Sequence, residues 1–430
     1  MALDLHMRIP VADVQHAHPG DDVVIAGWAE TVKNLGKIGF LSVRDRSGRV
    51  QVAVLDPTHI ASLTPESVVA VRGKVQASKQ KAGGNELLFV AMDVLSLAHP
   101  GVPIDVSGKT PAGLDVRLDN RYLDLRNPKV LAIFKVRSQI NHAIRLFLEQ
   151  EKFIEMQTPK IISAGAEGGA TLFPVAYFDK TAFLSQSQQL YKQMMLIAGF
   201  DRIFEIGPSF RAEKSNTMRH QTEFTQLDFE MAFINDEDDV LKVLERLFLH
   251  VATHVNAHCQ EQLAMLNGPI DVPTLPFPRV TYTDALALLG TKGRKMSFGD
   301  DIGTEDEKLL AQIVKEKFHT DAFFITKYPY DLKPFYIMTD GKVSRGFDFE
   351  FAGDELVSGG QREHRYEILR SQIEGKGLKV SDFDFYTTPF KYGAPPHGGF
   401  GMGIDRLTML LTNQRTIRDV VLFPLMRPQE

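Results

Sequence analysis

Cysteine is almost absent from this sequence of 430 residues, in which Cys259 stands alone. A lone cysteine excludes a disulfide within the chain and any zinc site made of several thiolates. Apolar runs are short as well, and each is interrupted well before the roughly 20 residues that a membrane helix needs. The N-terminus lacks the cationic start and apolar stretch of a secretion signal. We therefore expect a cytoplasmic protein.

An excess of either charge is also missing, because 49 Lys and Arg residues face 54 Asp and Glu residues, for a formal net charge of -5. Such a chain is unsuited to coating nucleic acid indiscriminately, so an RNA partner would need a local basic surface. Hydrophobic residues make up 43% and charged residues 24%, as in ordinary globular proteins. The length exceeds that of a single core and predicts two or three domains.

Residues 210–231 combine an arginine, a carboxylate, a basic loop and a strand of further carboxylates. Arg211 and Glu213 are two positions apart, so on an extended backbone both point to one face. From Phe224 to Glu230, apolar residues alternate with acidic or amide residues, which predicts a strand with two different faces. This combination suits a polyphosphate beside an amino group. An ordinary solvated hairpin is the alternative.

A glycine-dense strand that leads into an apolar helix is predicted for residues 390–410. Glycines at positions 399, 401 and 403 leave one strand face bare, so that a flat ring or a backbone can lie against it. Arg406 follows on the helix. The Gly-Lys-Ser/Thr ending of a P-loop is absent from this stretch, so the P-loop mode of phosphate binding is not expected here.

In these stretches the chain resembles class II aminoacyl-tRNA synthetases of subclass b, and within them the archaeal-type aspartyl-tRNA synthetases. Residues 210–231 resemble motif 2 of that family, residues 401–406 motif 3, and the helix before Pro159 motif 1. The resemblance extends in order over nearly the whole chain. It implies an α+β protein with an anticodon-binding OB-fold β-barrel, a hinge or linker, and a catalytic domain made of an antiparallel sheet flanked by helices. The corresponding ranges are 1–105, 106–128 and 129–430.

The first domain is predicted to be all β. Its strand patterns cover residues 23–28, 39–44, 50–54, 68–73 and 87–90. Five short strands separated by turns are typical of an OB-type barrel. Phe40 lies in a basic field with Lys37 and Arg44, and is either a stacking group for RNA bases or a residue of the barrel core. The resemblance implies that Phe40 stacks on an anticodon base and that Gln51 and Glu86 read bases.

The resemblance also implies how ATP is bound. Arg211 would hold the α-phosphate and the attacking carboxylate, while Arg406 and His220 would hold the γ-phosphate. Phe224 would lie against adenine with Arg406 on its other face, and Glu213 would fix the adenine amine. In this scheme Arg211 and Arg406 are catalytic. The implied ATP-binding set is Arg211, Glu213, Arg219, His220, Phe224, Glu355 and Arg406.

An aspartate site is implied by the same resemblance. Glu167 is the lone carboxylate of a small, glycine-rich loop that could close over a ligand. Lys192, which could otherwise be a surface lysine, and Arg362 would hold the side-chain carboxylate, and a guanidinium can do so with two parallel hydrogen bonds. Glu167, Gln189 and Asp228 would receive the α-ammonium. The implied set is Glu167, Gln189, Lys192, Asp228, Ser358 and Arg362.

Carboxylates for a metal ion occur around residue 350. Asp348 and Glu350 alternate with phenylalanines, so they share one face of a strand, and Glu355 follows a turn. Hard oxygen ligands from two neighbouring strands suit Mg²⁺ together with phosphate oxygens, although most acidic strand faces are simply solvated. The resemblance implies that Asp348, Glu355 and Ser358 hold Mg²⁺.

Residues 130–153 are predicted to form an amphipathic helix. Its apolar positions are Ile133, Val136, Ile140, Ile144 and Phe147. They recur at helical spacing, which fits a core helix of one subunit as well as an interface helix. The resemblance implies a homodimer formed through this helix and Pro159.

Other functions are disfavoured by particular residues. An asparaginyl enzyme of the same subclass should not place Lys192 beside an amide substrate, and a lysyl enzyme needs anions instead of Lys192 and Arg362. A paralogue that makes asparagine from aspartate and ATP has no need of the barrel. A non-catalytic RNA-binding module has no need of Arg211, Glu355 or Arg406.

Choice of tRNA is predicted from the barrel. By resemblance, the position of Glu30 helps to decide between tRNA-Asp and tRNA-Asn, and Glu30 is neither the tryptophan nor the histidine associated with the two known behaviours. The short loop at residues 82–85 offers little to exclude a wrong base. We expect relaxed specificity, with aspartate attached to tRNA-Asp and also to tRNA-Asn.

Overall fold

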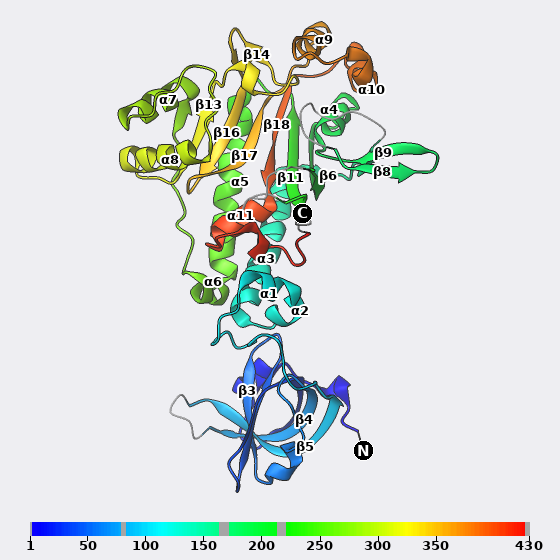
Figure 1. Ribbon diagram of the computed structural model, residues 1–430, viewed down its shortest axis with the longest axis vertical. Coiled ribbons are helices and arrows are strands. Elements are labelled where there is room, and N and C mark those ends of the chain that lie inside the picture. Colours follow the sequence, from blue (N-terminus) through cyan, green and yellow to red (C-terminus); the bar gives the residue numbers. More distant parts are fainter. Residues whose placement is uncertain (1, 79–82, 163–171, 213–220, 426–430) are drawn as a thin grey trace. The chain divides into compact units, whose positions relative to one another are not determined.

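The computed structural model describes residues 2–78, 83–162, 172–212 and 221–425 (Figure 1). The chain forms two compact units, Met1–Asn127 and Pro128–Glu430. Within residues 106–128, which the sequence predicts to be a linker, lie two short helices, α1 (Leu114–Asp119) and α2 (Arg121–Asp124). The assignment of this segment as a linker stays a prediction.

The N-terminal unit is a closed barrel with the strand order β1-β2-β3-β5-β4. The strands are β1 (Asp22–Asn34), β2 (Gly39–Arg44), β3 (Arg49–Val54), β4 (Val68–Ala77) and β5 (Asn85–Ser96). Alternate residues such as Leu41, Val43 and Val52 point inward and are buried. The five predicted strands are therefore confirmed, and three of them extend well beyond their predicted ends.

An eight-stranded sheet forms the centre of the C-terminal unit, in the order β12-β13-β16-β17-β18-β11-β10-β6. The strands are β6 (Ile154–Glu155), β10 (Arg202–Phe210), β11 (Glu223–Ala232), β12 (Arg279–Thr281), β13 (Ala322–Thr326), β16 (Gly346–Phe351), β17 (Asp354–Gln361) and β18 (His397–Gly403). Neighbours from β13 to β10 pair antiparallel. The edge strands β12 and β6 pair in parallel, so the sheet is mixed only at its edges.

Two small sheets lie outside this main sheet. Strands β7 (Ile161–Ile162), β9 (Lys180–Leu184) and β8 (Pro174–Tyr177) form one of them, and β14 (Thr339–Asp340) with β15 (Val343–Ser344) forms the other. The β8–β9 hairpin projects from the rest of the C-terminal unit (Figure 1).

Two long helices cover one face of the main sheet. Helices α3 (Pro128–Gln150) and α5 (Glu237–His258) lie side by side (Figure 1). Val136 and Ile140 of α3 and Leu244 of α5 share one hydrophobic core with Leu227 and Phe229 of β11. This apolar packing covers one face of the sheet, and the opposite face carries polar groups.

The other helices of this unit are shorter. They are α4 (Gln189–Ile197), α6 (Gln260–Leu266), α7 (Tyr282–Thr291), α8 (Thr304–Phe318), α9 (Tyr366–Gly375), α10 (Asp384–Thr387) and α11 (Ile404–Leu411). Helices α7 and α8 share a separate core with β12 and β13, which includes Leu289, Leu310 and Phe323.

The apolar stripe of α3 is buried within this chain. Val136, Ile140, Ile144 and Phe147 belong to the main core, and Ile133 packs with residues near the C-terminus. The interpretation of α3 as a core helix is therefore confirmed. Because these side chains are already covered, a partner subunit would have to use other surfaces of this region.

Candidate active site

A cavity of about 460 Å³ opens on the polar face of the main sheet. Strands β11, β17 and β18 and helices α4 and α11 supply much of its lining. Eight of the residues singled out from the sequence line it: Gln189, Arg211, Phe224, Asp228, Glu355, Ser358, Arg362 and Arg406. They come from segments as much as two hundred residues apart, and the antiparallel order β17-β18-β11 brings them together.

The glycines of β18 have different roles. A Cβ atom on Gly401 would meet nothing closer than Gln226 Oε1 at 4.0 Å, so this residue leaves open space on the cavity side. A Cβ atom on Gly399 would lie 2.0 Å from the carbonyl oxygen of Phe229 and 2.3 Å from Glu230 Oε2. The expectation that all the glycines make a bare ligand surface is thus met by Gly401 and Gly403, whereas Gly399 makes room for Glu230.

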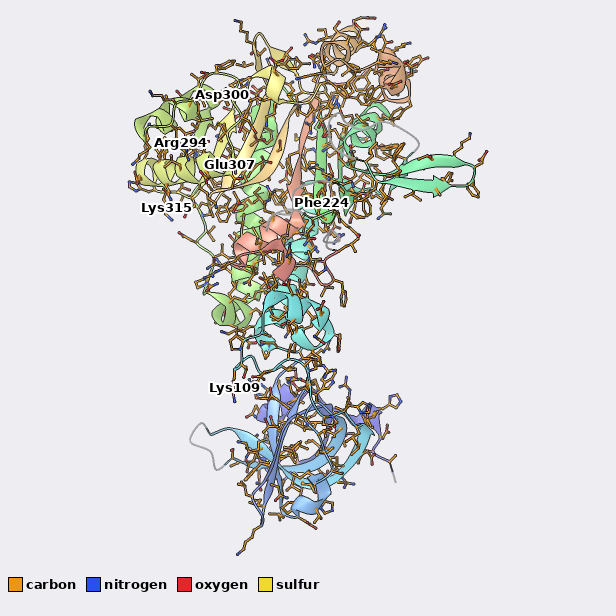
Figure 2. The ribbon with its side chains drawn as sticks, in the orientation of Figure 1. Lys109, Phe224, Arg294, Asp300, Glu307 and Lys315 are labelled. Carbon is orange, nitrogen blue, oxygen red and sulfur yellow. The ribbon has the colours of Figure 1, made fainter. Side chains whose placement is uncertain are left out.

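Cations and an aromatic ring gather at one end of the cavity. The guanidinium of Arg211 lies 5.1 Å from the ring centroid of Phe224, whose place on β11 is marked in Figure 2. Arg211 Nε is buried and has no hydrogen-bond partner among the described residues. Arg406 donates from Nη1 to the backbone oxygen of Glu355. Glu213, Arg219 and His220 lie outside the described residues, so their expected roles stay predictions.

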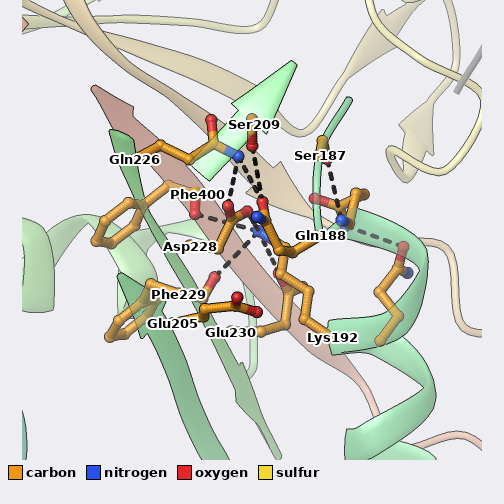
Figure 3. Close-up of polar contacts among 12 residues, drawn as sticks. Ser187, Gln188, Lys192, Glu205, Ser209, Gln226, Asp228, Phe229, Glu230 and Phe400 are labelled. Atoms are coloured by element: carbon orange, nitrogen blue, oxygen red, sulfur yellow. Dashed lines mark hydrogen bonds and ion pairs between the residues drawn. The ribbon is translucent and has the colours of Figure 1, made fainter. Parts of the chain in front are cut away.

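A network of buried charges closes the other end (Figure 3). Lys192 Nζ lies 3.0 Å from Asp228 Oδ1 and 3.3 Å from Glu230 Oε2, and it also donates to the backbone oxygen of Phe400 at 3.1 Å. Asp228 accepts from Gln226 Nε2, and Gln226 in turn donates to Gln188 Oε1 at 2.7 Å. Lys192 therefore lies behind the cavity wall, whereas Asp228 lines it. Glu167 lies outside the described residues.

Arg362 is held by a buried carboxylate. Its Nε and Nη2 donate to the two oxygens of Glu230 at 2.9 and 3.1 Å, and the Arg362 and Glu230 side chains are 2% and 0% exposed. Burial opposes ionisation of Glu230, but the charges of Arg362 and Lys192 outweigh it and hold the pKa of Glu230 below its usual value. Arg362 and Lys192 are thus two cations fixed by a shared anion.

Acidic groups lie beside the cavity on β16 and β17. Lys333 Nζ donates to both oxygens of Asp348 at 2.7 Å. Glu355 is half-buried, and desolvation together with the Asp348 charge raises the pKa of Glu355 to about 7. Lys333 and Glu355 line both the main cavity and a second cavity of about 290 Å³, whereas Asp348 lines only the second.

The second cavity has the character of a cation site. Glu350 Oε2 is buried there without a hydrogen-bond partner among the described residues, and Glu307 of α8, labelled in Figure 2, also lines it. Burial and the Glu355 carboxyl raise the pKa of Glu350 well above its usual value. Within the described ranges no three His, Cys, Asp or Glu side chains are arranged to hold a metal alone. A cation would fit with one or two carboxylates if substrate or water oxygens completed its shell.

The residues singled out on the barrel also lie together. Gln51 Nε2 donates to Glu86 Oε2 at 2.9 Å, and Gln51 pairs with Ser42, two positions from Phe40 on the same strand face. Phe40 is half-buried and is not part of the barrel core, so the core interpretation of Phe40 is wrong. Glu30 is paired with the buried Arg44 at 3.3 Å.

Sequence reasoning missed two charged residues of this region. Glu230 lies two positions after Asp228 on the predicted acidic strand face, so the alternation could have identified it. Lys333 lies in a segment that the sequence analysis left without a function. Its contact with Asp348 depends on how the loop before β14 folds back on β16, which no local pattern indicates.

Comparison with known proteins gives the family. Residues 113–427 match the model for class II tRNA synthetases of the D, K and N group. The chain belongs to the class II tRNA synthetases. Residues 23–97 match the model for an OB-fold nucleic acid binding domain. Family members use ATP with a divalent metal, and the resemblance noted in the sequence is confirmed.

Similar proteins include two kinds of aspartate ligase. The chain is 48% identical over 415 residues to the aspartate–tRNA(Asp) ligase of Thermococcus kodakarensis, covering 94% of this chain and 95% of the relative. It is 46% identical over 421 residues to the aspartate–tRNA(Asp/Asn) ligase of Methanopyrus kandleri, covering 96% of each. Similarity of this kind therefore does not separate the two tRNA specificities.

Solved structures share the fold over the whole length. The asparaginyl-tRNA synthetase of Pyrococcus horikoshii complexed with asparaginyl-adenylate has a TM-score of 0.89 at 33% identity, covering 97% of this chain and 98% of that one. A putative aspartyl-tRNA synthetase of Leishmania major has a TM-score of 0.90 at 30% identity, covering 98% and 94%. Among the described residues, helices of a length and hydropathy that would span a membrane are absent.

Proposed function

We propose that this chain uses ATP to join L-aspartate to tRNA-Asp through an aspartyl-adenylate. The observation that carries the proposal is the guanidinium of Arg362, which lines the cavity and is fixed by Glu230, with Lys192 behind the wall on the same Glu230 carboxylate. A substrate with a carboxylate side chain meets positive charge there, whereas an amide does not need it. This argument favours aspartate over asparagine.

In the first step the aspartate carboxylate attacks the α-phosphorus of ATP and pyrophosphate leaves. Such a transfer requires positioning and charge stabilisation more than a protein base. Arg211, whose buried Nε has no hydrogen-bond partner among the described residues, holds the α-phosphate, and Arg406 holds the γ-phosphate with His220. Phe224 lies against adenine, and Glu213 and Arg219 complete the nucleotide site. The Arg211 guanidinium already lies over one face of the Phe224 ring. Adenine would therefore either lie beside Arg211 on that face or stack on the opposite face.

The amino acid is held at the other end of the cavity. Arg362 and Lys192 bind its side chain, with Ser358 nearby, while Glu167, Gln189 and Asp228 receive the α-ammonium. In the second step a hydroxyl of the 3′-terminal ribose of tRNA attacks the aspartyl carbonyl carbon, the bond from that carbon to the phosphate oxygen breaks, and AMP leaves, its phosphate accepting the hydroxyl proton.

The metal is proposed to be Mg²⁺. Asp348, Glu355 and Ser358 would hold it. When bound, Mg²⁺ would neutralise negative charge on the phosphate oxygens. The mutually repelling carboxyl groups of Asp348 and Glu355 support a cation at this position, where the Lys333 ammonium already pairs with both oxygens of Asp348.

The barrel is proposed to bind the anticodon, with Phe40 stacking on a base and Gln51 and Glu86 reading bases. Homodimerisation is proposed to use the exposed face of α3 together with Pro159, which is exposed and flanked by the exposed apolar residues Ile154 and Ile161. The ranges 1–105, 106–128 and 129–430 remain the proposed domain division. A cytoplasmic location follows from the proposed substrate tRNA.

Amino-acid-dependent exchange of pyrophosphate into ATP tests the proposal. Exchange should depend on aspartate and should be at least about 30-fold weaker with asparagine or lysine, since losing one partner of a buried charge pair typically costs about 2–5 kcal/mol. Adding tRNA should give aspartyl-tRNA. Exchange with asparagine in preference to aspartate would contradict the proposal, and exchange without charging would indicate an asparagine-forming paralogue.

Phe40→Ala is expected to raise KM for tRNA about five- to a hundredfold and to leave aspartate-dependent exchange unchanged. Stacking of one base on an aromatic ring contributes about 1–3 kcal/mol. Leu55→Ala, at a residue just after β3 that is 67% exposed, is the matched control and should alter neither quantity. Equal KM values for tRNA in the wild type and in Phe40→Ala would remove Phe40 from the anticodon site.

Both tRNA-Asp and tRNA-Asn are expected to be charged with aspartate. Glu30 forms an ion pair with Arg44 within the barrel, so its carboxylate contributes little to the rejection of a wrong base. A single base contact discriminates by about 1–3 kcal/mol. Charging of the two purified transcripts measures the ratio. A preference for tRNA-Asp above about a hundredfold would identify a discriminating enzyme.

A further inference from the structure

Four buried polar side chains form a hydrogen-bonded chain that ends at the cavity. They are His397 at the start of β18, Gln193 and Gln189 on α4, and Tyr386 on α10, and none is more than 4% exposed. The His397 and Gln193 Nε2 atoms are 2.9 Å apart. Gln189 Nε2 donates to Gln193 Oε1 at 2.9 Å, and the Tyr386 hydroxyl donates to the same oxygen at 3.1 Å. Only Gln189 lines the cavity.

The direction of each hydrogen bond follows from His397. Its Nδ1 lies 2.8 Å from the backbone oxygen of Pro395, which can only accept, so Nδ1 carries the proton. Burial lowers the pKa of His397 to about 4, so the ring is neutral near pH 7 and Nε2 is an acceptor. Gln193 must then donate from Nε2 to His397, which turns its Oε1 toward Gln189 and Tyr386.

The same logic orients Gln189. Because Gln189 Nε2 donates to Gln193, the amide nitrogen of Gln189 points toward the interior. The amide oxygen of Gln189 therefore points away from Gln193. The backbone nitrogen of Gln189 also donates to Ser187 Oγ at 3.0 Å, which holds the first turn of α4. A freely rotating amide could present either a donor or an acceptor to a ligand, but an ammonium group can be bound only by an acceptor.

We propose that His397, acting through Gln193, positions Gln189 so that its carbonyl oxygen accepts a hydrogen bond from the α-ammonium of aspartate. This inference rests on the proposed function. His397 and Gln193 are positioning residues, since neither lines the cavity. The neutral tautomer of one buried imidazole thus sets the orientation of two amides in series.

A double-mutant cycle tests the relay. Gln193→Met keeps the length of the side chain but removes the acceptor for Gln189. It should raise KM for aspartate about ten- to a hundredfold in pyrophosphate exchange and change KM for ATP less than about twofold. In a Gln189→Met background, Gln193→Met should raise KM for aspartate further by less than about twofold. Multiplicative effects of the two changes would show that Gln193 does not act through Gln189 and would overturn the proposal.

Succinate separates positioning from a general structural role. It lacks only the amino group of aspartate, so its inhibition constant should change less than about twofold in Gln193→Met. An equal loss for succinate and aspartate would overturn the proposal. Tyr386→Phe removes one donor but keeps the Gln193 acceptor, and should leave KM for aspartate within about threefold.

His397→Leu should act in the same direction as Gln193→Met and should also lose its effect in the Gln189→Met background. If His397→Leu fails to fold, the double-mutant cycle of Gln193→Met and Gln189→Met still tests whether Gln193 acts through Gln189. A wild-type protein without aspartate-dependent exchange would refute the proposed function. A wild-type protein with such exchange and an unchanged Gln193→Met variant would refute the relay alone.

Discussion

Arg362→Ala is expected to reduce kcat/KM for aspartate in pyrophosphate exchange by about 30-fold or more, with KM for ATP nearly unchanged. In the proposed site, removing the guanidinium takes away the cation that faces the side-chain carboxylate of aspartate. It also leaves Glu230 buried without the partner that now donates to both its oxygens. Lys192→Ala should have an effect of similar size, because the ammonium of Lys192 lies 3.3 Å from the carboxylate of Glu230.

Loss of folding must be separated from loss of binding in these variants. Removing one partner of a buried ion pair can cost about 3–5 kcal/mol of stability. Arg362→Lys keeps the charge but loses the two parallel hydrogen bonds, so it should fold and still activate aspartate poorly. Lys242→Ala, at an exposed lysine paired with Asp238, is the matched control and should behave like the wild type. Unchanged aspartate dependence in a folded Arg362 or Lys192 variant would remove that residue from the site.

Glu355→Gln is expected to reduce the rate of metal-dependent adenylate formation by about a hundredfold. Binding of tRNA through the barrel should stay intact. The amide keeps the shape of the side chain but is a weaker ligand for a hard cation. Asp348→Asn should act in the same direction. Glu316→Gln, on the exposed side of α8, is the control for loss of a carboxylate in the same unit. A parallel fall in tRNA binding would show that the assignment of the two functions to separate units is wrong.

Glu355→Gln should also make the protein more stable at alkaline pH when metal and ATP are absent. Burial and Asp348 raise the pKa of Glu355 to about 7, above the unfolded value near 4.5. A raised carboxyl pKa contributes stability at low pH, and that contribution is lost as the pH rises through about 7. The Tm of Glu355→Gln relative to the wild type should therefore increase between pH 5 and pH 8 in a chelating buffer. A constant difference over this range would contradict the repulsion between Glu355 and Asp348.

Much of the fold follows from local sequence patterns. The barrel strands were predictable because short β-branched runs alternate with turn residues, and the predicted range of the second strand, 39–44, is the same as that of β2. The two faces of β11 were predictable because Leu227 and Phe229 alternate with Gln226, Asp228 and Glu230. The stripe of α3 showed its periodicity, but only the packing against α5 and the sheet decided that it belongs to this chain's own core.

The sequence by itself determined which residue types the site contains, and the tertiary structure decided which of them pair with each other. Arg362 and Glu230 are 132 positions apart and meet because β18 lies between β17 and β11. The packing of α4 against β11 places Lys192 behind the cavity wall, and the folding of a distant loop brings Lys333 to Asp348. Local propensity and periodicity depend on neighbours within a few positions, whereas buried ion pairs depend on sheet order. Charges that a linear pattern presents as separate ligands are therefore linked in the folded protein into one network.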